Sequence, residues 1–311
     1  MIFITTYHSP DTDGISCSIA YKELMEKQGK AAEITYFGDL SREVEFVRKY
    51  TSFFPAKRHE GKYPSDAEFI LVDAADPEAV EPTIFPERVK AVFDHRELVF
   101  TAKFINAEIK IEKVGSCATL MTELFSKGRK IPSQKTAVWL YSAIISNTVN
   151  FKNTVTTQRD IEAATWLRPM AKVDRDYVRK MFEYKSRIRN EKELRFLIDQ
   201  DFSTKELYGK KVGIAQIEIA KLEKMLASYN TVIRKVLKEY LAGESLDYVL
   251  FTGVDIVEGF NVFMVADKKS GAFFSKVLGI SNVGGKFKRR GIIMRKQIWP
   301  KIEVVLKRMV Q

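Results

Sequence analysis

Three places in the chain carry aspartates, and two of these also carry a histidine, which are residue types that bind metal ions. The chain has only three histidines, and two of them, His8 and His95, have aspartates beside them. Imidazole and carboxylate groups suit Mn²⁺ or Mg²⁺, and the absence of cysteine among them argues against a structural zinc site. Any one of these acids alone is more often a helix N-cap, but jointly they favour a metal centre. The candidate ligands are His8, Asp11, Asp13, Asp73 and His95, with Asp94 beside them.

The spacing inside Asp11-Thr12-Asp13 adds to this hypothesis. Two acids two residues apart in an extended loop can each reach a different metal ion, whereas without a cation they would repel one another. His59 lies in the charged stretch PAKRHEGKYP without such neighbours, and we expect it to be a surface residue.

Each candidate ligand follows a short apolar run that predicts a strand. Such runs occur at 2–7, 32–37, 69–74 and 89–94, and helical patterns occur between them at 14–27 and 41–50. This alternation predicts a parallel sheet with crossover helices. The carboxyl ends of parallel strands open into one crevice, so the ligands can converge there.

The rest of the chain predicts a helical extension and a second domain. The expected fold class is therefore α/β with two domains, which suits a chain of 311 residues. We predict domains at 1–188 and 197–311, joined by a charged linker at 189–196. Helices are expected at 117–127, 134–147, 157–170, 174–189 and 220–241, and further strands at 210–219, 247–256 and 261–266.

Composition narrows the class of protein. No run of 18 apolar residues and no signal-peptide pattern is present, so we expect a cytoplasmic protein without a membrane span. Cys17 and Cys117 are expected to be buried free thiols. The net charge of +11 suits a polyanionic partner, but many basic residues alternate with acids and predict solvated helix faces.

Four segments resemble the ordered motifs of the DHH phosphoesterase superfamily. They are HSPDTDG (8–14), LVDAAD (71–76), FDHRE (93–97) and AIISNTVNF (143–151). In the second half, YGKKVGIAQIEI, LFTGVDIVEGFNVFMVAD and MRKQIWP resemble the C-terminal substrate-binding domain of the manganese-dependent (family II) inorganic pyrophosphatases and related exopolyphosphatases. The resemblance covers most of the chain.

The resemblance implies a centre with two ions, Mn²⁺ by preference and Mg²⁺ or Co²⁺ as alternatives. One ion would be held by His8 and Asp11, and the other by Asp13 and His95. Asp73 would bridge both ions, and Asp94 would orient His95. A water shared by two ions becomes a nucleophile for a phosphoanhydride bond. The implied catalytic residues are Asp73, Asp13 and Arg96, the further metal ligand is Asn147, and the phosphate-binding residues are Arg96, Lys205, Arg295 and Lys296.

Four departures from the family pattern bear on activity. The first motif is one residue short, so either His8 reaches differently or Tyr7 occupies the ligand position. Arg96 stands where the family has the second histidine of DHH, and it cannot serve as an acid near neutrality. Asn147 replaces an aspartate ligand, and Ser203 replaces a lysine, although Lys205 lies two residues along on the same strand face.

The predicted function is hydrolysis of pyrophosphate or short polyphosphate in the cleft between two domains. Two alternatives stay open: a catalytically degenerate phosphate- or nucleotide-binding protein, and a phosphodiesterase acting on short oligonucleotides. The second is less favoured because SNVGGKFKRRG (281–291) lacks the histidine of a GGH-type loop. We expect a small phosphate-containing substrate rather than nucleic acid or a membrane, and leave a homodimer open.

Overall fold

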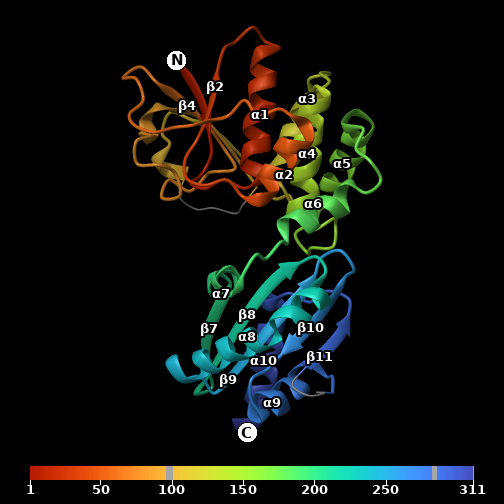
Figure 1. Ribbon diagram of the computed structural model, residues 1–311. Helices are drawn as coiled ribbons and strands as arrows, with labels where there is room; N and C mark the ends of the chain where they lie inside the picture. Colours follow the sequence, from red (N-terminus) through yellow and green to blue (C-terminus); the bar gives the residue numbers. More distant parts are fainter. Residues whose placement is uncertain (96–100, 282–285, 311) are drawn as a thin grey trace. The chain divides into compact units, whose positions relative to one another are not determined.

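The computed structural model describes residues 1–95, 101–281 and 286–310, so Arg96 lies outside the described residues. The chain divides into two compact units, Met1–Lys185 and Ser186–Gln311 (Figure 1). Among the helices of the described ranges, none is long and apolar enough to span a membrane.

The first unit is built on a sheet of six parallel strands. Their order is β3-β2-β1-β4-β5-β6. Strands β2 and β3 are added on one side of β1, whereas β4, β5 and β6 are added on the other, so the order of addition changes side between the parallel neighbours β1 and β4. The predicted parallel sheet is confirmed, and the strands at its two edges, β3 and β6, are additional to the predicted ones. The strands are β1 Ile2–Thr5, β2 Glu33–Tyr36, β3 Lys57–Arg58, β4 Glu68–Val72, β5 Val89–Asp94 and β6 Glu108–Ile111.

Helices of the first unit pack beside this sheet (Figure 1). Their N-termini use short polar caps: Ser116 Oγ accepts the Ala118 N–H, and Ser133 Oγ accepts the Thr136 N–H. The predicted helices at 117–127 and 134–147 begin and end where expected. The helices are α1 Thr12–Glu26, α2 Arg42–Thr51, α3 Cys117–Lys127, α4 Gln134–Asn147, α5 Gln158–Ala171 and α6 Tyr177–Lys185, with 3₁₀ turns at Pro86–Arg88 and Thr101–Lys103.

The second unit is a mixed five-stranded sheet in the order β11-β10-β9-β8-β7, with one apolar core on each face. β8 and β9 are parallel and are joined by α8, whereas the other neighbours are antiparallel. The elements are α7 Glu191–Gln200, β7 Phe202–Leu207, β8 Lys210–Ile219, α8 Leu222–Gly243, β9 Tyr248–Asp255, β10 Phe260–Met264, α9 Lys268–Leu278, β11 Lys286–Arg290 and α10 Arg295–Val310.

Helix α7 occupies most of the predicted linker at 189–196. Asn190 Oδ1 accepts the Glu193 N–H at 2.9 Å, while the Glu193 carboxylate accepts the Arg189 N–H at 2.7 Å. The Asn190 side chain is thus the N-cap of helix α7, and Glu193 in its first turn also accepts the N–H of the residue before the cap. Leu194 and Ile198 of α7 are buried in the core of the second unit, so these residues are part of that unit.

Candidate metal centre

The candidate site lies where the sheet order reverses. β1 and β4 are adjacent and parallel, with Thr5 opposite Leu71, and the chain crosses to opposite sides after them. Ligands of open parallel sheets bind at such a switch point, beyond the carboxyl ends of the strands. The first motif follows β1 and Asp73 follows β4, so the topology places both at this point.

Asp13, Asp73 and His95 come together as one group whose ligand atoms lie within 4.8 Å of one another. His95 Nε2 is 3.4 Å from Asp73 Oδ1 and 3.9 Å from Asp13 Oδ2. Both carboxylates are fully buried and the imidazole is 13% exposed. Three of the predicted ligands therefore share one site.

Asp13 is held by the start of another helix. Its carboxylate accepts the backbone N–H groups of Cys117 and Ala118, both at 2.8 Å, and the hydroxyl of Ser116 at 3.0 Å. These groups form the N-terminus of α3, whose partial positive charge favours an anion. The carboxylate is thus fixed in place by two helices, because Asp13 itself lies in the first turn of α1.

The Asp73 backbone is held in a turn directly after β4. Its φ of 56° is in the left-handed region, which aspartate adopts more readily than most residues. The Asp73 N–H donates to the Phe93 carbonyl at 2.7 Å, which connects the turn to β5. This conformation lies at the site, where backbone strain is commonly stored.

The imidazole of His95 is oriented by a backbone carbonyl. Its Nδ1 lies 3.0 Å from the Val114 oxygen, so Nδ1 carries the proton and donates there. Nε2 then faces Asp73 and Asp13 and is the nitrogen available to a metal ion.

Burial and mutual proximity shift the pKa values of the three groups. Burial, with Asp13 nearby, raises the pKa of Asp73 well above its usual range, and burial also raises the pKa of Asp13. Burial opposes protonation of His95, but its hydrogen bond to Asp73 and the two carboxylates outweigh this and raise its pKa to about 10. A divalent cation would relieve these conflicts by replacing the proton, and the two carboxylates and one imidazole nitrogen match the ligands of Mn²⁺. The residues therefore fit a metal ion.

Asp94 supports the site in a different way from that expected. Its carboxylate accepts the N–H of Ala75 at 2.7 Å and the N–H of His95 at 2.6 Å. It therefore holds the backbone of the two loops that carry Asp73 and His95, whereas Val114 orients the ring.

Asn147 lies beside the group and contacts Asp13. Its side-chain amide donates to Asp13 Oδ2 at 2.6 Å, and Asn147 is the last residue of α4. The amide thus occupies one of the carboxylate's acceptor positions. Where an aspartate would present a second negative charge, this chain has a hydrogen-bond donor.

The described structure does not bring His8 into the group. Its Nδ1 contacts Glu81 Oε1, and its side chain is 58% exposed. The backbone holds this arrangement, since the His8 N–H donates to the Ala79 carbonyl and the Ser9 N–H to the Phe37 carbonyl. The expected first-motif ligand therefore points to a neighbouring loop.

Tyr7 and Asp11 occupy the adjacent space. The Tyr7 hydroxyl accepts the Asp11 N–H at 3.1 Å, and its pKa is raised by burial and by the charges of Asp11 and Asp73. Asp11 is the N-cap of α1, and its Oδ1 accepts the N–H groups of Asp13 and Gly14. Of the two first-motif alternatives, the structure places Tyr7 nearer the acids.

Each half of the chain matches the model of a known protein family. The model of the DHH family, N-terminal domain, matches residues 1–144, and the model of the DHHA2 domain matches residues 179–305. The chain joins a DHH-family domain to a DHHA2 domain. The resemblance predicted from the motifs is confirmed.

Whole-length relatives agree with this assignment. A Bacillus cereus protein named "Probable manganese-dependent inorganic pyrophosphatase" is 26% identical over 297 residues, covering 95% of each chain. A Lactobacillus acidophilus protein of the same name is 27% identical over 299 residues, again covering 95% of each. A Methanococcus jannaschii structure assigned to the family II inorganic pyrophosphatases is 27% identical, with a TM-score of 0.64, and the match covers 99% of this chain and 100% of that one.

In the DHHA2 domain, the predicted phosphate ligands gather around the first turns of α10. Arg295 begins this helix, and its guanidinium pairs with the Asp201 carboxylate at 2.6 Å. The Lys205 ammonium lies over the Trp299 ring, 5.3 Å from its centroid. Lys296 is exposed beside Arg295. Arg96, the remaining predicted ligand, lies outside the described residues.

Sequence reasoning missed Glu43, a buried acid in the first turn of α2. Its Oε2 accepts the hydroxyls of Thr12 at 3.3 Å and Ser146 at 2.5 Å, and lies 3.3 Å from the Lys185 ammonium. Thr12 precedes Asp13 and Ser146 precedes Asn147, so Glu43 joins the two segments that meet at the site. The sequence of α2 has the pattern of an ordinary amphipathic surface helix, so this contact could not be predicted from the sequence.

We expect Glu43→Gln to weaken Mn²⁺ binding by about tenfold or more, because residues that orient ligands have effects of about 10–100-fold. Calorimetric titration measures the affinity, and Glu45→Gln on the same helix is the matched control. A purely structural role would lower the free energy of unfolding and leave the Mn²⁺ affinity unchanged, which would contradict the assignment.

Mn²⁺ affinity should rise with pH between about 6 and 9. With a pKa of about 10, His95 is protonated in the metal-free protein over this range, and metal binding requires the neutral ring. Binding should therefore release protons, so that the calorimetric enthalpy depends on the ionisation enthalpy of the buffer. An enthalpy that is the same in all buffers would show that His95 gives up no proton to the metal.

Proposed function

We propose that this chain is a metal-dependent phosphohydrolase that cleaves pyrophosphate or short polyphosphate. The observation that carries the proposal is the buried Asp13–Asp73–His95 group at the switch point of a DHH-family domain. The names of the full-length relatives support manganese and pyrophosphate as metal and substrate.

The metal-binding residues would work through charge and position. A bound divalent ion supplies a Lewis acid for the phosphoryl oxygens and lowers the pKa of its water. Asp13 and Asp73 provide the negative charge that holds the ion, while the Val114 carbonyl keeps His95 Nε2 aimed at it. Burial excludes bulk water and strengthens each of these interactions.

Two ions, with Asp73 between them, are part of the proposal. Asp13, Asp73 and His95 would hold one ion, and Asp11 with Asp73 would hold the other. The His8–Glu81 contact leaves the ion at Asp11 without an imidazole ligand, and the Asn147 amide occupies an acceptor position of Asp13, a ligand of the other ion. We therefore expect each ion to bind more weakly than in a centre with the full family set of ligands.

Arg295, Lys296 and Lys205 are proposed to bind the phosphate. Arginine offers a planar fork and lysine a mobile point charge, and both suit a phosphoanhydride. This role requires closure of the DHHA2 domain on the DHH domain during turnover. Interdomain closure, a homodimer and a cytoplasmic location all remain predictions.

Phosphate release tests the function directly. We expect turnover of pyrophosphate or tripolyphosphate with Mn²⁺, and slower or no turnover of long polyphosphate and of a dinucleotide. Mg²⁺ and Co²⁺ serve as alternative metals. Tight binding of pyrophosphate without turnover under any metal would favour the degenerate phosphate-binding protein, and preferential cleavage of the dinucleotide would favour the phosphodiesterase.

Asp73→Asn should weaken Mn²⁺ binding by more than about 100-fold, since even residues that only orient ligands contribute about 10–100-fold, and should abolish phosphate release. Because burial disfavours the ionised carboxylate, the metal-free variant should be at least as stable as the wild type in urea denaturation. Asp76→Asn in the same loop is the control. Retained tight Mn²⁺ binding in Asp73→Asn would rule out Asp73 as a ligand.

Asn147→Asp should tighten Mn²⁺ binding by about tenfold or more by adding a charged ligand. Without metal, the new carboxylate would face Asp13, where the amide now donates, so the metal-free variant should unfold at a lower temperature. Thermal unfolding with and without Mn²⁺ measures both effects, with Asn150→Asp as the control. Equal Mn²⁺-induced stabilisation in wild type and variant would place residue 147 away from the ion.

A further inference from the structure

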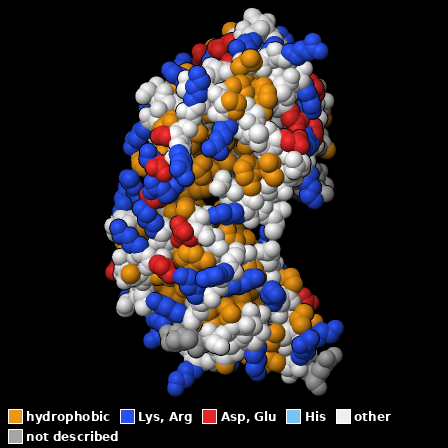
Figure 2. All heavy atoms as spheres, turned by 90° about the vertical axis from the view of Figure 1, so that its right-hand side faces the viewer, with side chains coloured by type: hydrophobic (Ala, Val, Ile, Leu, Met, Phe, Trp, Pro, Cys, Tyr) orange, Lys and Arg blue, Asp and Glu red, His pale blue; other side chains and the backbone are white. Residues whose placement is uncertain are grey.

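The net positive charge of the chain is concentrated in the DHHA2 half. Residues 186–311 contain 24 of the 51 Lys and Arg residues but only 14 of the 40 Asp and Glu residues, so they carry +10 of the net charge of +11. Figure 2 shows many Lys and Arg side chains and few acids over this unit on the face in view. Such a surface attracts anions, and the question is where one would be recognised.

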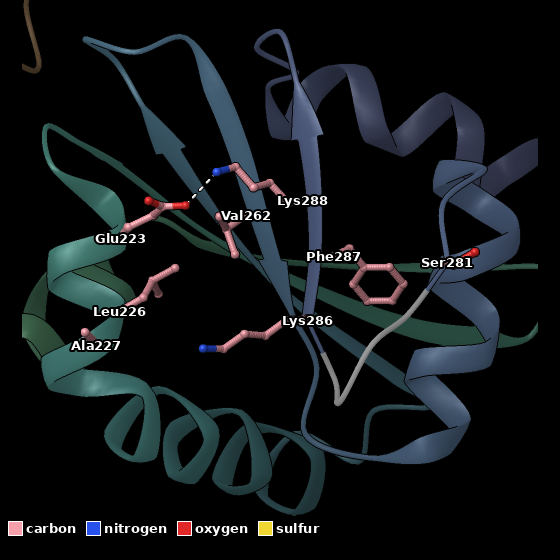
Figure 3. A pocket seen from close by; sticks show the side chains of 8 residues that line it. All are labelled: Glu223, Leu226, Ala227, Val262, Ser281, Lys286, Phe287 and Lys288. Carbon is pink, nitrogen blue, oxygen red and sulfur yellow. Dashed lines mark hydrogen bonds and ion pairs between the residues drawn. The ribbon is translucent and has the colours of Figure 1, made fainter.

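A cavity of about 620 Å³ lies between the start of α8 and the strands β10 and β11 (Figure 3). This volume is typical of small-molecule sites, which span roughly 300–1,000 Å³. Helix α8 packs on β9, and the sheet continues past it to β10 and the edge strand β11. The cavity therefore lies where one face of the sheet extends beyond its covering helix.

The cavity has an apolar side. Leu226 of α8 and Val262 of β10 are 4% and 6% exposed and line it from the helix and the sheet. Figure 3 shows these two side chains directed toward each other, with Ala227 one residue further along α8. An apolar ring or chain would lose water-exposed surface by lying on them.

Two lysines of β11 line the same cavity. Strand alternation sends Lys286 and Lys288 to the cavity face, while Phe287 is buried in the core of the opposite face. The Lys288 ammonium is 2.6 Å from the Glu223 carboxylate, which neutralises it. Among the described residues, no carboxylate lies within ion-pairing distance of Lys286. In Figure 3 the Lys286 side chain extends across the cavity toward Leu226 and Ala227.

We propose that this cavity, the α8–β11 pocket, binds a small phosphate that carries an apolar ring, such as a nucleoside monophosphate. Lys286 binds the phosphate, and Leu226 and Val262 bind the ring. The exposed Glu223–Lys288 pair is a polar edge of the cavity that can both accept hydrogen bonds from the sugar or base and donate hydrogen bonds to it.

This pocket is separate from the residues proposed to bind the substrate phosphate. Lys205 lies on β7, at the opposite edge of the five-stranded sheet from β11. Its ammonium contacts Trp299, which belongs to the core of the other sheet face. A ligand in the α8–β11 pocket therefore does not compete with the phosphate ligands around α10, and the inference stands without the proposed function.

Calorimetric titration of the full-length protein in chelator, without divalent ions, tests the proposal. The probes are AMP, naphthyl phosphate, adenosine and inorganic phosphate. We expect AMP to bind one site and both fragments to bind at least about tenfold more weakly. Adenosine lacks the charge-assisted contact with Lys286, and inorganic phosphate lacks the ring that would bury apolar surface on Leu226 and Val262. If naphthyl phosphate binds as tightly as AMP, the result would support recognition of a phosphate that carries an apolar ring. It would also show that the pocket makes no specific contact with the sugar.

Variants locate the site. Lys286→Ala should weaken AMP binding by at least about tenfold through the lost charged contact, and Ala227→Trp should block the pocket. Lys276→Ala removes an equal charge at an exposed position of α9 and should leave AMP affinity unchanged, as should Arg295→Ala. Thermal unfolding confirms that each variant is folded. Failure of both AMP and naphthyl phosphate to bind, or unchanged AMP affinity in Lys286→Ala and Ala227→Trp, overturns the proposal.

Discussion

The burial of two carboxylates beside one imidazole is the constraint on which the first domain depends. Asp13 and Asp73 are fully buried, and hydrogen-bond donors and an imidazole from other segments offset part of the cost of burying their carboxyl groups. The N-terminus of α3, the Asn147 amide and the His95 ring supply these groups. The centre therefore connects β1, β4, β5, α1, α3 and α4, and its geometry follows from the packing of all of them.

The residues at which the chain departs from the family pattern make hydrogen bonds within this arrangement. The shortened first motif leaves His8 tied to Glu81 and brings the Tyr7 phenol toward Asp11, where a neutral hydroxyl accepts a backbone N–H. The Asn147 amide likewise serves as a donor to Asp13. Both changes lower the negative charge or the number of candidate ligands around the site, so they would weaken the binding of divalent cations.

The DHHA2 domain has a different electrostatic character. Nearly all of the chain's excess positive charge lies in it, and part of this charge is organised at two places on the sheet. Arg295 and Lys205 lie around α10 at the β7 side, whereas Lys286 and Lys288 line the α8–β11 pocket at the opposite edge. The two proposed phosphate sites therefore differ in their surroundings, one being polar and the other having an apolar wall.

The sequence by itself determined the parallel sheet, the helices at 117–127 and 134–147 and the convergence of Asp13, Asp73 and His95. These features follow from local patterns, since apolar runs mark buried strands and polar residues at their ends must meet at one edge. The strand β11 was not predictable in this way, because KFKRR at a sheet edge buries only Phe287 fully. Charged edge strands carry little periodic signal.

Only the tertiary structure decided how the remaining polar groups pair. Three examples are the Val114 carbonyl on His95, the Glu43 contacts with Thr12 and Ser146, and the His8 contact with Glu81. All of them involve residues far apart in the sequence or loop backbone held by distant carbonyls. A hydrogen bond between such groups depends on angles and distances that packing alone sets. Residue types at a motif therefore indicate which atoms can bind a metal, whereas the fold decides which of them face it.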